Sequence, residues 1–263
     1  MNNSTLVSEP PATEAQVLQY QNDGFLVLRN VFSGAEMAEL QAEAAALVER
    51  TELIDVNNIR CRWKNNVETD QCSFDCFDPV IDLGPVCARI ARDPRIIEAV
   101  GALYGETACL FKDKLIFKSP GIEGYALHQD YISWESFPKS FVTVILAIDS
   151  ASADNGATEV FPGHHKKGNI SANDGQYHEL PLSAVDISKG VILDLEAGDI
   201  AIFSGYTPHR SAANRSKQMR RQLYLSYNSF SDGGEQRDAH YAEFKGWLQN
   251  RYADYGKTNT YFR

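Results

Sequence analysis

A histidine and an aspartate lie two positions apart in the stretch GYALHQDYISW, which covers residues 124–134. On a β-strand, residues i and i+2 point to the same face, so His128 and Asp130 would enter one cavity while Gln129 turns away. An imidazole and a carboxylate are both common metal ligands. Two ligands do not hold a divalent ion, so a metal site here requires at least one more side chain from elsewhere in the chain.

His209 is the best candidate for the third ligand. It follows a strongly apolar run in IAIFSGYTPHRSAANRS, just past an expected strand, where a side chain can reach the mouth of a barrel or sandwich. The other histidines lie in polar, turn-rich or charged segments, at His164, His165, His178 and His240. Two histidines and one carboxylate on one face of a metal leave open coordination positions, which is typical of non-haem Fe(II) oxygenases.

Two arginines, Arg220 and Arg221, open the strand-like run that follows His209. If the open metal positions admit 2-oxoglutarate and O2, the distal carboxylate of 2-oxoglutarate needs a cationic partner. Arginine suits this task because its planar fork pairs with a carboxylate through two hydrogen bonds. Side chains alternate along a strand, so only one of the two arginines can point into the cavity.

Short β-branched or aromatic runs dominate the second half of the chain, and they must position these residues. Runs such as SFVTVILAIDS and GVILDLEAGDIAIFSG are punctuated by the turn signals ADNG, PGHH and EAGD. Several short strands of this kind predict an antiparallel sandwich or barrel. Residues 24–32 read as a further strand, whereas residues 53–78 look irregular.

Helices are expected mainly in the N-terminal part. Ser33 and Glu36 form a capping-box motif at the start of a segment rich in alanine, glutamate and leucine. The expected helices cover residues 12–22, 35–52 and about 84–104, with one more near the C-terminus. We therefore expect a single domain over residues 1–263 that is mainly β, with N-terminal helices packed on the barrel and residues 1–11 as a flexible tail.

Composition narrows the functional classes. The 263 residues carry a formal net charge of −10, which argues against binding to nucleic-acid phosphates. No apolar run has membrane-spanning length, and the N-terminus lacks the pattern of a secretory signal. Five cysteines, an odd number, suit reduced thiols. We expect a cytoplasmic protein with a small-molecule substrate and no nucleic-acid or membrane partner, and the sequence leaves the oligomeric state open.

Four segments together resemble the phytanoyl-CoA dioxygenase (PhyH) family of Fe(II)/2-oxoglutarate-dependent oxygenases. They are YQNDGFLVLRNVFSGAEMAEL, DKLIFKSPG with LHQD, ADNGATEVFPGHHKKG, and GDIAIFSGYTPHRSAANRS with the arginine pair after it. The resemblance runs over most of the chain and implies a double-stranded β-helix, or jelly roll. It also implies hydroxylation by O2, coupled to the oxidative decarboxylation of 2-oxoglutarate to succinate and CO2.

The same resemblance assigns roles to individual residues. The implied Fe(II) ligands are His128, Asp130 and His209. The implied cosubstrate residues are Arg220, Ser211, Lys118 and Thr143. Arg220 rather than Arg221 would bind the C5 carboxylate of 2-oxoglutarate, with Ser211 beside it. Families that halogenate replace the carboxylate ligand with a small residue, so Asp130 favours hydroxylation.

Basic and amide side chains gather in the segment NNIRCRWKNN, although the protein as a whole is acidic. Arg60, Arg62 and Lys64 alternate and can share one face, and Asn57 lies in the same segment. Such a cluster can bind a compact anion, for example a phosphonate, through charge-assisted hydrogen bonds. A solvated basic loop is the alternative interpretation.

Tyr131 and Trp134 follow the His-x-Asp motif and can contact an ammonium group through cation–π interactions, unless they are ordinary core aromatics. These features resemble the branch of the family that hydroxylates 2-aminoethylphosphonate or its N-methylated relatives next to phosphorus, which is the expected substrate class. Ectoine, another small zwitterion, and an acyl-CoA are alternative substrates. A cupin-type barrel that holds its metal without catalysis is the non-enzymatic alternative.

Overall fold

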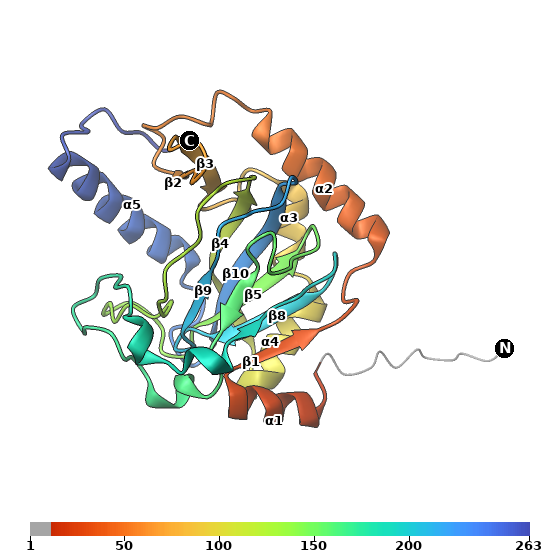
Figure 1. The fold of residues 1–263 in the computed structure, drawn as a ribbon. Coiled ribbons are helices and arrows are strands. Elements are labelled where there is room, and N and C mark those ends of the chain that lie inside the picture. Colours follow the sequence, from red (N-terminus) through yellow and green to blue (C-terminus); the bar gives the residue numbers. More distant parts are fainter. Residues whose placement is uncertain (1–11) are drawn as a thin grey trace.

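Two antiparallel sheets form the centre of the computed structural model, which describes residues 12–263 (Figure 1). In this described part the larger sheet has the strand order β1-β8-β5-β10-β4-β3-β2 and the smaller sheet has the order β7-β6-β9. The strands are β1 Phe25–Leu28, β2 Cys61–Asn65, β3 Cys72–Phe77, β4 Ala108–Lys118, β5 Val142–Ala147, β6 Thr158–Val160, β7 Val191–Ile192, β8 Ile200–Ser204, β9 His209–Ser211 and β10 Arg220–Ser229. The expected mainly β jelly roll is confirmed, while the expected tail at residues 1–11 lies outside the described residues.

Helices cover the outer face of the larger sheet. The helices are α1 Glu14–Asp23, α2 Gly34–Val48, α3 Pro85–Ile90, α4 Pro94–Tyr104 and α5 Arg237–Asp254. Leu40 of α2 and Val100 of α4 share one buried core with Val144 and Leu223 of the sheet. Burial of each such side chain contributes about 1.5–3 kcal/mol, which holds the N-terminal helices on the barrel as expected. Figure 1 shows α5 apart from this layer, on the side away from α2.

Local signals explain where two of these helices begin. Ser33 accepts a hydrogen bond from the backbone N–H of Glu36, whose carboxylate accepts from the Ser33 N–H, so the expected capping box is present. The expected helix over residues 84–104 is instead two helices. Asp93 caps the second one and Pro94 occupies its first position, where proline is favoured, and this pair ends the preceding turn.

Residues 53–78 are not irregular throughout, because they contain the hairpin β2–β3. The hairpin joins the larger sheet where Cys76 and Phe77 pair with Ile116 and Leu115 of β4. Charged residues in β2 and a β-bulge at Asp75 of β3 interrupt the alternation that marks a strand in sequence. These strands therefore depend on packing against their neighbours, which a local pattern does not contain.

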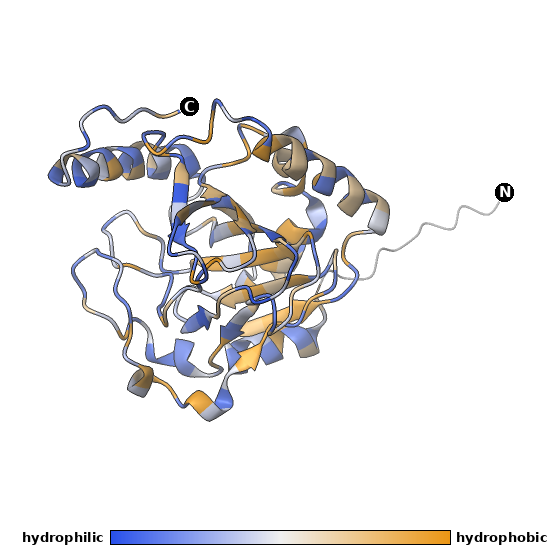
Figure 2. Cartoon of the chain, turned by 45° about the horizontal axis from the view of Figure 1, so that its top comes forward, coloured by the Kyte–Doolittle hydropathy of each residue, from blue (hydrophilic) through white to orange (hydrophobic). Residues whose placement is uncertain are grey.

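Alternation along β10 separates the two faces of the larger sheet. Leu223 and Leu225 pack into the core beneath the helices, while Arg220, Tyr224 and Ser226 line a cavity on the opposite face. Figure 2 shows mostly hydrophobic strands at the centre of the molecule. The polar side chains on the inner face are therefore exceptions within an apolar framework, and they mark the functional part of the barrel.

Two further expectations concern the chain as a whole. Within residues 12–263, no helix is both long and apolar enough to span a bilayer. All five cysteines have free thiols, as the sequence predicted.

Candidate metal centre

Backbone pairing brings His128 and His209 side by side. The N–H of each residue donates to the carbonyl oxygen of the other, at N···O distances of 3.0 and 2.9 Å, which forms an isolated antiparallel bridge. The structure thereby corrects the expectation of a regular strand through His128 and Asp130, because His128 forms only that isolated bridge and the chain bends at Leu127 and Asp130. Gln129 turns away as expected and donates to the carbonyl oxygen of Tyr206.

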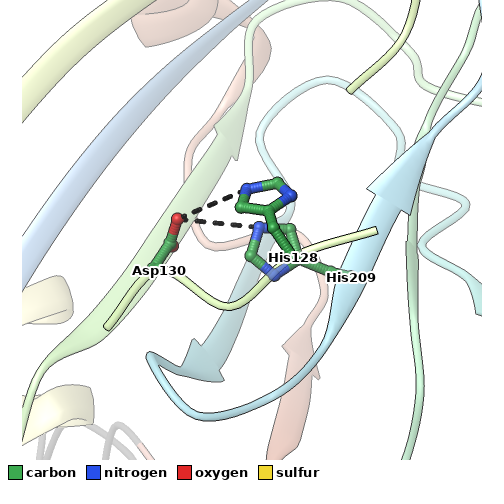
Figure 3. A group of neighbouring side chains, drawn as sticks. All are labelled: His128, Asp130 and His209. Atoms are coloured by element: carbon green, nitrogen blue, oxygen red, sulfur yellow. Dashed lines mark ion pairs between the residues drawn. The ribbon is translucent and has the colours of Figure 1, made fainter. Parts of the chain in front are cut away.

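Asp130 completes a compact group of three side chains that point toward one another (Figure 3). Its Oδ1 lies 3.8 Å from Nε2 of His128 and 3.7 Å from Nε2 of His209. The three potential ligand atoms lie within 4.8 Å of one another. Thr143 donates a hydrogen bond of 2.6 Å to Oδ2 of Asp130, so Oδ1 is the oxygen that faces the histidines.

Hydrogen bonds on the far side of each ring orient the two imidazoles. Nδ1 of His128 lies 2.7 Å from the carbonyl oxygen of Ala126, and Nδ1 of His209 lies 3.0 Å from that of Thr207. A carbonyl oxygen only accepts, so each Nδ1 carries the proton and each Nε2 presents a lone pair to the centre of the group. Partners of this kind orient the histidine ligands of metal sites. The donor set therefore fits a divalent transition-metal ion.

Burial and neighbouring charges set the protonation states of this group. Burial, together with His209 nearby, lowers the pKa of His128 below its ordinary value and keeps its imidazole neutral. Burial acts in the opposite direction on Asp130, but His209 and Lys114 outweigh it and lower the pKa of this carboxyl group. Neutral imidazole and ionised carboxylate are the forms that bind metal ions.

Arg220 is a buried cation that faces the same cavity. One of its terminal nitrogens donates to the carbonyl oxygen of Gly156 at 2.6 Å, its Nε lacks a hydrogen-bond partner, and no carboxylate of residues 12–263 forms an ion pair with it. Arg221 points the other way and binds Asp149 through two nitrogens, at 2.8 and 2.7 Å. A buried guanidinium without an acidic partner is costly, so this end of the cavity suits an anionic ligand.

Lys118 lies opposite Arg220 across the β4–β10 pair and does not itself line the cavity. Its ammonium donates to Oγ of Ser211 at 3.0 Å and to the carbonyl oxygens of Gly156 and Ala212. Burial, with the positive charge of Arg220, lowers the pKa of Lys118 to about 7. Ser211 does line the cavity, so the structure brings it and Arg220 together and leaves Lys118 directly behind them.

The three metal-ligand candidates and Arg220 line one cavity of about 400 Å³. Much of the remaining wall is aromatic, formed by Tyr125, Trp134, Phe137, Phe141, Tyr177, Tyr224, Phe244 and Trp247. Its further cations are Lys64, Lys112, Lys114 and Arg210, whereas Asp130 and Glu179 are the acidic side chains of the lining. Lys64, Lys112 and Arg210 have acidic partners outside the lining, in Glu123, Asp78 and Glu159. Lys114 and Arg220 form no ion pair with residues 12–263, so these two cations favour an anionic ligand.

Arg60 and Arg62 lie outside this cavity, contrary to the expectation that they bind substrate. Arg60 forms a bidentate pair with Asp82, at 2.8 and 2.7 Å, and is buried. The guanidinium of Arg62 lies 3.7 Å from Asp78 and over the ring of Phe244. Both arginines therefore have protein partners and stay outside the cavity lining, which Lys64 of the same segment reaches.

Of the other expected substrate residues, Trp134 lines the cavity and Asn57 and Tyr131 do not. Asn57 belongs to a turn in which its backbone N–H donates to Asp55, and it does not line the cavity. Tyr131 packs on Tyr206, with ring centroids 4.6 Å apart, and is likewise outside the lining. Trp134 does line the cavity.

Sequence reasoning did not single out several cavity residues, among them Lys112, Lys114 and His240. The two lysines stand two positions apart in the strand-like run CLFKDKLIFK, and this spacing alone places them on one face. In the sequence His240 lies in a charged segment, yet its spacing with Phe244 and Trp247 marks one face of a helix. The sequence does not show that this helix face docks onto the cavity.

A model of the phytanoyl-CoA dioxygenase (PhyH) family matches residues 20–222. The chain belongs to this family. Membership confirms the resemblance read from the sequence, and with it the predicted enzyme class, a non-haem Fe(II)/2-oxoglutarate-dependent dioxygenase. The His-Asp-His group of this PhyH-family protein fits the iron that such enzymes use.

Individual relatives of this PhyH-family protein have been named for their substrates. A methylphosphonate hydroxylase of Gimesia maris is 35% identical over 160 residues, which are 59% of this chain and 58% of that protein, less than two thirds of its length. A 2-aminoethylphosphonate dioxygenase of the uncultured bacterium HF130_AEPn_1 is 27% identical over 235 residues, 86% of this chain and 85% of that protein.

Among solved structures, the apo form of EctD from S. alaskensis superposes with a TM-score of 0.71 at 21% identity, covering 88% of this chain and 81% of that one. A likeness at this level of identity supports the shared jelly-roll fold and carries no information about the substrate.

Proposed function

We propose that this protein hydroxylates a small phosphonate at the carbon next to phosphorus. The candidates are 2-aminoethylphosphonate or its N-methylated forms, as expected from the sequence, and methylphosphonate. The observation that carries the proposal is Lys114, a cavity lysine that forms no ion pair or hydrogen bond with residues 12–263. It stands beside Lys112 and Lys64, whose acidic partners Asp78 and Glu123 lie outside the lining. A phosphonate is a compact, multiply charged anion of the kind that such a cluster binds.

In this proposal His128, Asp130 and His209 hold Fe(II), and Thr143 orients the carboxylate ligand. When bound, iron supplies the activation of O2 that couples decarboxylation of 2-oxoglutarate to hydroxylation. Arg220 binds the distal carboxylate of 2-oxoglutarate, which provides the anionic partner that the buried guanidinium lacks among residues 12–263. The aromatic wall excludes water and so strengthens these electrostatic contacts.

The cavity also bears on the alternative substrates. Its volume of about 400 Å³ must hold 2-oxoglutarate as well, which favours a small substrate over an acyl-CoA. A zwitterion with a single carboxylate, such as ectoine, would bring less negative charge to Lys114 than a phosphonate does. Two relatives are named for phosphonates, which supports the same choice, although ectoine dioxygenases are also among the relatives.

A succinate-release screen tests the proposal. The iron-reconstituted protein is incubated with 2-oxoglutarate and, in parallel, with methylphosphonate, 2-aminoethylphosphonate, ectoine or no further substrate. We expect at least one phosphonate to accelerate succinate release well above the rate without substrate, with a hydroxylated phosphonate detected by ³¹P NMR. Stimulation by ectoine alone would reject the phosphonate assignment and leave the enzyme class intact.

A further inference from the structure

His240 on α5 is a buried histidine whose two ring nitrogens both lack a hydrogen-bond partner among the described residues. Only 5% of the residue is exposed, and its side chain lines the cavity. An unpaired polar group in such a position is destabilising, whereas a ligand in the cavity can supply the missing partner. The metal-ligand and cosubstrate residues described above do not include it.

The surroundings of His240 are almost entirely aromatic. Its ring lies 4.3 Å from that of Phe111 and is stacked at 5.6 Å on that of Phe244, with Trp134 at 6.5 Å. Burial, assisted by the positive charge of Lys112, lowers the pKa of His240 to about 3. The imidazole is therefore neutral and offers one N–H donor and one acceptor in an otherwise apolar wall.

Two lysines of β4 face the same region. Lys112 and Lys114 stand on the inner face of the strand, roughly 7 Å apart along it. The ammonium of Lys112 binds Asp78 at 2.9 Å and lies 4.1 Å above the ring of Phe244. Lys114, by contrast, forms no hydrogen bond or ion pair with residues 12–263, and it lines the cavity next to the metal-ligand group.

We propose that Lys112, Lys114 and His240 form a subsite between β4 and α5 that binds the oxyanion end of the substrate, in which the N–H of His240 and the ammonium of Lys114 donate to the phosphonate oxygens. This inference rests on the proposed function and extends it to particular residues. It places substrate selection at the junction of β4 and α5, with His240 as the contribution of the helix.

The charges around Phe244 determine which end of the substrate this subsite accepts. Lys112 and Arg62 already lie over its ring, at 4.1 and 5.2 Å from the ring centroid. A further ammonium group there would be repelled by both cations, so the aromatic wall beside His240 does not form an ammonium cage. An aminophosphonate would instead direct its amine toward Glu179, whose exposed side chain belongs to the cavity lining.

Anaerobic spectroscopy of the whole protein loaded with Fe(II) and 2-oxoglutarate tests the subsite. Methylphosphonate and 2-aminoethylphosphonate are titrated while the visible charge-transfer band is followed. The variants are His240→Phe, which keeps an aromatic ring among aromatic neighbours but removes the donor, His240→Gln, which restores a donor, and Lys114→Met. We expect His240→Phe and Lys114→Met to weaken the apparent affinity for both phosphonates about tenfold to hundredfold, and His240→Gln to recover part of it.

Two control variants carry the same type of change outside the cavity. His178→Phe removes a histidine that pairs with Asp174 in a loop, and Lys189→Met removes a lysine whose side chain is 75% exposed. Both should bind phosphonates as the unmodified protein does.

The outcomes distinguish this inference from the proposed function. If the unmodified protein responds to phosphonates and both Lys114→Met and His240→Phe respond with unchanged affinity, the subsite is wrong and the proposed function stands. If no phosphonate perturbs the band of the unmodified protein, the proposed function fails and the subsite fails with it. Lys114 forms no ion pair or hydrogen bond with residues 12–263, and its ammonium lies 5.0 Å from the ring centroid of Tyr224. Lys114→Met therefore keeps the test decisive should His240→Phe not fold.

Discussion

The hydroxyl of Thr143 on β5 donates a hydrogen bond of 2.6 Å to Oδ2 of Asp130. This contact determines which carboxylate oxygen faces the two histidines, and it connects the centre of the larger sheet to a segment that lacks regular strand pairing of its own. A residue that acts through a metal ligand in this way is a positioning residue. Its loss should change iron binding more than it changes the fold.

Replacing Thr143 with valine keeps the shape of the side chain and removes the donor. We expect Thr143→Val to weaken Fe(II) binding about tenfold to hundredfold, measured by anaerobic titration, because partners of metal ligands contribute on this scale. Thr158→Val is the matched control, since Thr158 also lines the cavity but its hydroxyl contacts Tyr224 at 3.2 Å. Equal iron affinities for the two variants would contradict the role given to Thr143.

Arg220 and Arg221 are adjacent in β10, so substitutions at the two positions form a test of 2-oxoglutarate binding and its control. Arg220→Leu should raise the apparent KM for 2-oxoglutarate about tenfold or more while iron binding persists, because it removes the charged donor from the cavity. Arg221→Leu breaks the pair with Asp149 on the outer face and should lower thermal stability with little change in that KM. A larger KM effect for Arg221→Leu would reverse the assignment.

The lowered pKa of Lys118 leads us to expect that 2-oxoglutarate binding depends on pH. Burial and Arg220 lower the pKa of Lys118 to about 7, so its ammonium adds positive charge behind Arg220 below that pH and loses it above. The apparent KM for 2-oxoglutarate should therefore rise as pH increases through about 7. In Lys118→Met this step should disappear. A step of equal size in the variant would assign the titration to another group.

The metal-ligand candidates were accessible to sequence reasoning because their signals are local. The short spacing of His128 and Asp130 and the position of His209 after an apolar strand can be read directly from the chain, and the family resemblance adds the choice of Arg220 over Arg221. The structure brings the three metal-ligand candidates together although His128 and Asp130 do not lie on a regular strand, so strand alternation was the wrong reason for their common orientation.

The substrate region was not accessible in the same way, because its contacts are long-range. Arg60 looked available in sequence, yet Asp82 and the C-terminal segment bury it. His240 looked like part of a charged segment, yet the docking of α5 buries it against Phe111 of β4. Partners separated by many residues leave no periodic signal, so only the folded chain shows which cations are already paired and which are free.

One anaerobic titration tests the central claim most directly. The protein is mixed with Fe(II) and 2-oxoglutarate in the absence of O2, alongside a His209→Ala variant. We expect a weak visible charge-transfer band that saturates at one iron per chain in the unmodified protein and is lost in the variant. A band of equal strength in both proteins, or no band in either, would contradict the claim that His128, Asp130 and His209 together hold the iron.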